Sequence, residues 1–181
     1  MLTDKHLDRY ADVLLWGLKK ARTGKYKKND IIMIRYDLAA IKLAEVLHEK
    51  LLHMKMNPLL RMGTTSRMEL NFFKIANHEQ LVFQPPGSRE LCKKLNGSIF
   101  LHAPESLTHL STVDPGKIGK SAIARKPLRD ILNKREEIGA FGWTLCMLPT
   151  PELAKKASLP LSDYTNQLIK SCYLHKSHPA D

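Results

Sequence analysis

The sequence contains few cysteines and no long apolar segment, and these two shortages exclude several classes of protein. Only three of its 181 residues are cysteines, and no two of them form a Cys-x-x-Cys pair. An odd, scattered set of this kind favours reduced, buried thiols over a disulfide framework. No stretch approaches the roughly 20 apolar residues that span a bilayer, and the charged amino-terminal segment lacks the apolar centre of a signal peptide. We therefore expect a cytoplasmic protein without a membrane partner.

Motifs for nucleotide binding and for serine hydrolase chemistry are also missing. The sequence contains neither G-x-G-x-x-G nor G-x-S-x-G. Residues 114–121, DPGKIGKS, end like a P-loop, but Asp114 stands where the opening glycine belongs. A carboxylate there would repel a phosphate, so we interpret this stretch as part of a long basic loop over residues 105–121.

The two histidines of the segment HEKLLH do not form a zinc-protease motif. His48 and His53 are separated by five positions, whereas H-E-x-x-H places its histidines at i and i+4 on one helix face. At 3.6 residues per turn, the second ring points about 140° away from the first. We therefore assign no catalytic residue and no metal ligand to this chain.

The chain is strongly basic, with 29 Lys and Arg residues against 18 Asp and Glu and a formal net charge of +11. The positive residues concentrate in segments 19–28 and 117–135, and such clusters can neutralise phosphates. Tyr26 is the sole aromatic residue in either segment, although single-strand binders interleave aromatic side chains that stack on bases. We interpret the clusters as a solvated face and do not expect nucleic acid as a partner. A stand-alone basic α/β module that binds anionic partners such as nucleic acid stays as the alternative.

Apolar patterning along the chain predicts helices that alternate with strands. A stripe at helical spacing marks residues 3–18, and short apolar runs mark strands at 31–34, 58–62, 98–102 and 142–148. Helical patterns occupy 40–54, 122–137 and 162–174, and shorter ones lie near 68–75 and 88–95. Alternation of this kind predicts a single α/β domain over residues 1–181, with three layers and a mainly parallel sheet of about four to five strands flanked by helices.

Open parallel sheets bind ligands in the crevice outside the carboxyl ends of their strands. Candidate cleft-lining residues are therefore Arg35 after the first strand, His102 after the third, and Pro149 and Thr150 after the fourth, together with Trp143 on the fourth strand. Each has a simpler explanation as well. Thr150 can cap the next helix, and Arg35 can form a surface ion pair.

The carboxyl-terminal quarter of the sequence resembles a known family. A strand that carries Trp and ends in Pro-Thr is followed by an Ala-containing turn, a Ser-x-Tyr helix and a final Pro. The matching residues are Trp143, Thr144, Pro149, Thr150, Ala154, Ser162, Tyr164 and Pro179. This pattern is similar to that of the thermophilic metalloaminopeptidases, the aminopeptidase T and aminopeptidase S family.

The resemblance implies a role within a larger enzyme. Members of that family are cytoplasmic homodimers that release amino-terminal residues from peptides. They use two divalent ions of zinc or cobalt type, held in a carboxy-terminal domain whose matching positions lie beyond Asp181. The resemblance therefore implies an amino-terminal domain, truncated before the metal-binding half, that controls access to the active site. Its expected partners are its own carboxy-terminal domain, a second copy of the enzyme and the peptide substrate, and alone it should be inactive.

We expect the purified, untagged chain to bind no divalent ion stoichiometrically, because its histidines are dispersed and the His48 and His53 pair is mis-spaced. Elemental analysis after exposure to zinc or cobalt and removal of the free ion checks this. One equivalent of either metal per chain would contradict it.

Overall fold

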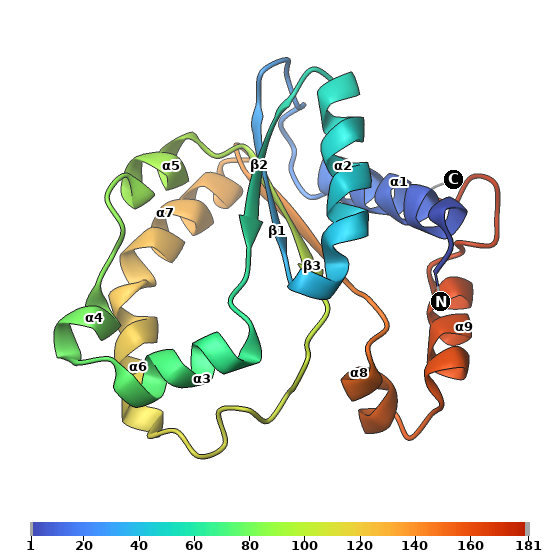
Figure 1. Cartoon of the computed structure of the whole chain (residues 1–181). Coiled ribbons are helices and arrows are strands. Elements are labelled where there is room, and N and C mark those ends of the chain that lie inside the picture. The colour runs from blue at the N-terminus through green and yellow to red at the C-terminus, as the bar shows by residue number, and fades with distance from the viewer. Residues whose placement is uncertain (1, 180–181) are drawn as a thin grey trace.

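Four parallel strands form one sheet in the order β2-β1-β3-β4 (Figure 1). The computed structural model describes residues 2–179. The strands are β1 (Ile31–Tyr36), β2 (Asn57–Met62), β3 (Gly97–His102) and β4 (Gly142–Met147). Helices lie on both sides of this sheet, so the predicted three-layer α/β fold with a parallel sheet is confirmed.

One face of the sheet is covered by α1 (Asp4–Lys20) and α2 (Ile41–His53). Thr3 starts α1, since its hydroxyl accepts from the His6 N–H and the His6 ring accepts from the Thr3 N–H. The apolar stripes of both helices pack on the buried side chains of the strands, which include Ile34, Ile99 and Leu101. This is the main core of the protein. Helix α9 (Leu161–Ser171) adds to it, and Leu174 after that helix is fully buried.

The opposite face is covered by α5 (Ser88–Lys94) and α7 (Lys126–Glu137) near the amino-terminal ends of the strands. Their contact with the sheet is a small apolar cluster around Met33, Leu95 and Phe141. Met33 lies two positions before Arg35 on the same face of β1, so this cluster ends before Arg35 and the residues paired with it on the neighbouring strands. Helices α5 and α7 therefore cover the carboxyl-terminal part of this face less completely than its amino-terminal part.

A further group of helices stands beside the sheet at the lower left of Figure 1. It consists of α3 (Ser66–Ile75), α4 (His78–Val82) and α6 (Pro115–Ala124). These helices have their own apolar cluster, formed by Phe73, Ala76, Leu81 and Val113. The remaining elements are the 3-10 turn η1 (Leu38–Ala40) and α8 (Pro151–Lys156), which follows β4.

The expectation that residues 105–121 form a loop holds for residues 105–114, which contain no helix or strand, and is wrong for residues 115–121. Helix α6 begins at Pro115, where proline fits the first turn because its missing N–H needs no partner. The Asp114 carboxylate accepts from the Gly116 N–H at 2.9 Å and so caps this helix. The helix expected over 122–137 is divided at Arg125, because Pro127 cannot continue the hydrogen bonding of the preceding turn. The sequence DPGKIGKS at residues 114–121 thus forms the cap and the first turns of α6.

No helix within residues 2–179 is both long enough and apolar enough to cross a membrane.

The guanidinium group of Arg22 joins the amino-terminal ends of three strands. Its side chain is only 5% exposed. One terminal nitrogen donates to the Asn96 carbonyl at 3.3 Å and to the Ala140 carbonyl at 3.1 Å, before β3 and β4. The other terminal nitrogen lies 3.1 Å from an Asp30 carboxylate oxygen, before β1. The group also donates to two carbonyls of its own turn at 2.6 Å and lies 3.8 Å from the Tyr26 ring centre.

We expect Arg22→Ala to lower the free energy of unfolding by about 3–5 kcal/mol, because it leaves the Asp30 carboxylate and several carbonyls without their shared donor. Arg22→Lys should recover little of this loss, since an ammonium group cannot reproduce the planar array of donors. Urea denaturation measures both changes.

Tyr26→Phe is the matched control. Burial raises the pKa of Tyr26 to about 12, and its buried hydroxyl has no hydrogen-bond partner among residues 2–179. The substitution removes only this hydroxyl and leaves the ring in contact with Arg22. The free energy of unfolding should therefore stay constant or rise slightly. An Arg22→Ala protein as stable as Tyr26→Phe would contradict the assigned role of Arg22.

Candidate functional site

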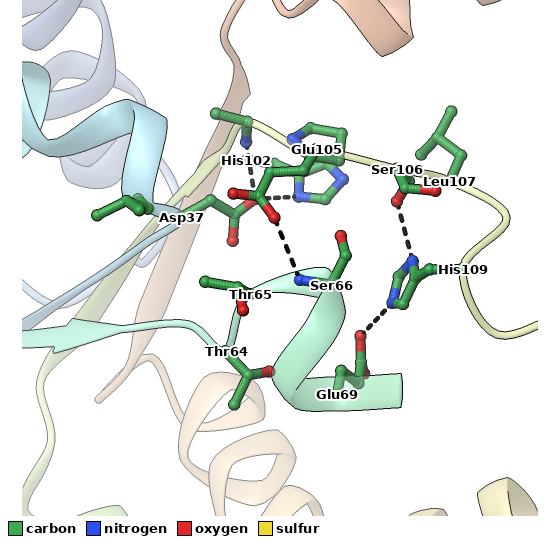
Figure 2. A pocket seen from close by; sticks show the side chains of 13 residues that line it. Asp37, Thr64, Thr65, Ser66, Glu69, His102, Glu105, Ser106, Leu107 and His109 are labelled. Carbon is green, nitrogen blue, oxygen red and sulfur yellow. Dashed lines mark hydrogen bonds and ion pairs between the residues drawn. The ribbon is translucent and has the colours of Figure 1, made fainter. Parts of the chain in front are cut away.

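A hollow of about 200 Å³ lies at the carboxyl-terminal edge of the sheet. Asp37 after β1 and His102 at the end of β3 form one wall, and the first turn of α3 forms another. The loop from Ala103 to His109 closes the third side (Figure 2). Open parallel sheets bind their ligands outside the carboxyl ends of their strands, which is where this hollow lies.

Asp37 connects the ends of the two central strands. One of its carboxylate oxygens accepts from the Ala103 N–H at 2.8 Å and lies 2.9 Å from the His102 Nδ1 atom. The His102 contact is off the line of the ring N–H, so it is an electrostatic contact and not an aligned hydrogen bond. A Cβ atom at position 63 would lie 3.1 Å from the other carboxylate oxygen of Asp37. A residue with a side chain at position 63 would therefore press on Asp37.

A second carboxylate and histidine pair lies across the hollow. The His109 Nε2 atom lies 2.7 Å from a Glu69 carboxylate oxygen, and its Nδ1 atom lies 3.1 Å from the Ser106 carbonyl oxygen. Both ring nitrogens thus face oxygen acceptors. A neutral imidazole has only one N–H, so the ring satisfies both acceptors only when it carries two protons. Figure 2 shows that this pair ties α3 to the loop.

Two more carboxylates hold the same loop in place. Glu105 accepts from the Ser66 N–H at 3.3 Å at the start of α3, where the positive end of the helix favours a negative charge. Glu152 on α8 accepts from the Leu107 N–H at 3.1 Å. The amino terminus of α3 is therefore already occupied by a carboxylate of the chain itself.

The hollow offers polar groups but no complete catalytic arrangement. Its carboxylates pair with histidines or backbone N–H groups, and it contains no cysteine. Across residues 2–179, no three side chains of His, Cys, Asp or Glu type are grouped so that they could hold a metal ion. The two carboxylate and histidine pairs supply two donors each. The residues described here therefore do not fit the two-metal centre that the family resemblance implies.

Of the five candidate residues predicted from the sequence, His102 alone lines the hollow. Arg35 lies on the sheet face that α5 and α7 partly cover, in the part of that face that is exposed. Trp143 lies at the beginning of β4, 48% exposed, and its indole N–H donates to Glu136 at 3.1 Å. Thr150 is buried and its hydroxyl accepts from the Leu153 N–H at 3.3 Å, so it caps α8. Pro149 lies between β4 and that cap.

Sequence reasoning missed Glu69, Glu105 and His109 as members of this site. Glu69 and His109 are 40 positions apart, and they meet only because the loop after β3 returns to α3. No local pattern marks such a contact. The one available signal was the position of the loop, since it follows the carboxyl end of a central strand.

Comparison with known proteins gives two findings. A family model described as thermophilic metalloprotease (M29) matches residues 3–181. Among solved structures, the chain is similar to wild-type AmpT from Thermus thermophilus, with a TM-score of 0.67 and 15% sequence identity. The match covers 91% of this chain and 41% of that chain, and at this identity it shows the fold alone. No curated protein matches the sequence significantly.

We expect Asp37→Ala to lower the free energy of unfolding by about 1–3 kcal/mol, because it leaves the Ala103 N–H buried without an acceptor. Asp37→Asn keeps an acceptor oxygen for this N–H and should cost less. Urea denaturation of both variants separates the hydrogen bond from the charge. Equal losses in the two would contradict a hydrogen-bonding role for Asp37.

Proposed function

The chain belongs to the thermophilic metalloprotease family M29, and on this premise we propose that it is the access-controlling amino-terminal domain of a two-metal aminopeptidase. The longer parent enzyme releases amino-terminal residues from peptides. This domain supplies part of the wall of the active-site cavity and not the reacting groups. Its partners are the carboxy-terminal domain of the same enzyme, a second copy of that enzyme and the peptide substrate, in the cytoplasm.

The extent of the structural match supports the proposal that the metal ions are bound outside this domain. The chain spans 41% of the length of AmpT, and the likeness covers nearly all of the chain. Peptide hydrolysis by two metals needs several ligands that converge on ions about 4 Å apart. Residues 2–179 offer only isolated carboxylate and histidine pairs. We therefore assign the two divalent ions, of zinc or cobalt type, to the remainder of the parent.

The observation that carries the proposal is the way in which the loop beside the hollow is fixed. Glu69 of α3 and Glu152 of α8 each hold a residue of this loop. Glu105 of the loop itself accepts from the Ser66 N–H at the start of α3. Such contacts maintain a defined shape, because they replace solvation with charge-assisted hydrogen bonds at fixed positions. A wall of defined shape restricts which peptides enter a cavity. The family match does not favour the alternative of a stand-alone nucleic-acid module.

We expect peptidase activity with zinc or cobalt in the parent polypeptide that continues the same reading frame, and none in the 181-residue chain. In the parent, Leu107→Trp should raise the KM for long peptides several-fold while leaving hydrolysis of an aminoacyl p-nitroanilide unchanged, because Leu107 lines the hollow and is 45% exposed. Leu52→Trp is the control, since Leu52 is 52% exposed on α2, which covers the other face of the sheet.

Three results would overturn the proposal. The first is metal-dependent turnover by the 181-residue chain itself, which would place the catalytic groups within it. The second is a parent in which Leu107→Trp and Leu52→Trp have the same effect on long peptides. A reading frame that ends at Asp181 would likewise remove the basis for a separate catalytic domain.

A further inference from the structure

One row of side chains crosses the whole sheet on the face that α5 and α7 partly cover. The strand register places Arg61 beside Arg35, Arg35 beside Phe100, and Phe100 beside Leu145. We call these four residues the arginine row. Both arginines are exposed, Leu145 is 49% exposed and Phe100 is half-buried. Side chains on the same face of adjacent strands are neighbours, so the row is a continuous surface.

Within residues 2–179, no carboxylate forms a direct ion pair with the positive charges of this row. Within residues 2–179, Arg35, Arg61 and Arg125 form no ion pair shorter than 4.0 Å and donate no hydrogen bond from their side chains. The Arg35 guanidinium lies 5.2 Å from the Phe100 ring centre. Partial burial lowers the pKa of Arg35, and the nearby positive charges of Arg61 and Arg125 lower it further, although Asp37 opposes them. Three guanidinium groups that repel one another on an exposed surface favour an anionic ligand.

The apolar members of the surface limit the kind of anion. Leu145 and Phe100 continue the row beyond the arginines, and Trp143 lies two positions before Leu145 on the same face of β4. A ligand that fits must place a carboxylate or phosphate over Arg35 and Arg61 and an apolar group over β3 and β4. A peptide with mixed acidic and apolar side chains satisfies both requirements.

We propose that the arginine row binds an extended peptide segment, with a carboxylate of the peptide on Arg35 and Arg61 and an apolar side chain on Phe100 and Leu145. The choice of a peptide as ligand rests on the proposed function. Guanidinium groups suit this role, since their planar donors can hold a carboxylate with two parallel hydrogen bonds.

A nucleic acid fits the same surface less well. Its backbone carries a regular line of phosphates, whereas this surface has one carboxylate near Arg35 and another beside Trp143. Asp37 follows Arg35 by two positions, and Glu136 accepts the indole N–H of Trp143. The exposed aromatic ring that could stack on a base is thus held by an acidic residue. These negative charges oppose a polyanion but tolerate a single carboxylate.

Fluorescence anisotropy of a labelled peptide of alternating leucine and glutamate tests the proposal on the complete 181-residue chain. The peptide is acetylated at its amino terminus, so binding is measured without any cleavage. A second peptide has glutamine in place of glutamate. We expect Arg35→Gln and Arg61→Gln each to weaken binding of the glutamate peptide about five- to ten-fold, because each removes a charge-assisted contact.

Lys42→Gln is the charge-matched control, since Lys42 is an exposed residue of α2 on the other side of the sheet. It should change the affinity less than two-fold. Thermal melts of the two arginine variants should lie at or above that of the unchanged chain, because each substitution relieves repulsion between like charges. Weaker binding then reflects the lost contact and not unfolding.

Equal affinity for the glutamate and glutamine peptides, or unchanged affinity in both arginine variants, would overturn the proposal. Tighter binding of a short oligothymidylate, dependent on the same arginines and lost steeply with salt, would replace the peptide with a nucleic acid. Neither result affects the proposed access control, because the Leu107→Trp test in the parent measures the hollow. Failure of that test would overturn the access control without changing the affinities that anisotropy measures for the arginine row.

Discussion

The buried guanidinium of Arg22 sets the arrangement of the sheet, because it satisfies carbonyl groups that precede β3 and β4 and the carboxylate that precedes β1. These contacts fix where three strands begin. Parallel strands of equal length that begin together also end together, so the same constraint aligns the carboxyl-terminal edge. The hollow beside His102 therefore depends on an arginine at the opposite end of the sheet. At the carboxyl-terminal edge, the Asp37 carboxylate joins the ends of the two central strands.

The two faces of the sheet differ because the helices that cover them differ in length and in what else they contact. Helices α1 and α2 have 17 and 13 residues, and their stripes extend over the strands. Helix α5 has only seven residues, and α7 contains no buried residue. Helices α3, α4 and α6 pack around Phe73 in a separate cluster. The second face therefore retains an exposed row of arginine and apolar side chains.

Most of the fold could be predicted from the sequence because its signals are local. The apolar stripe of residues 3–18 and the short buried runs that became β1 and β3 each depend on neighbours a few positions away. The helix at 115–124 was missed, since its glycines and lysines resemble a loop until Asp114 is recognised as a cap. The pairing of Glu69 with His109 could not be predicted, because it requires the path of a loop across 40 positions.

Membership in a metalloprotease family does not make each part of an enzyme catalytic. The described residues of this chain provide shape and charge at one edge of a sheet but no group of metal ligands. The hollow and the arginine row meet there, since Arg35 faces the open side of the sheet while Asp37, two positions later, holds His102. A peptide that reaches the hollow would pass the same strand ends. The recognition that we propose for the row and the restriction that we propose for the loop would therefore both depend on one aligned sheet edge.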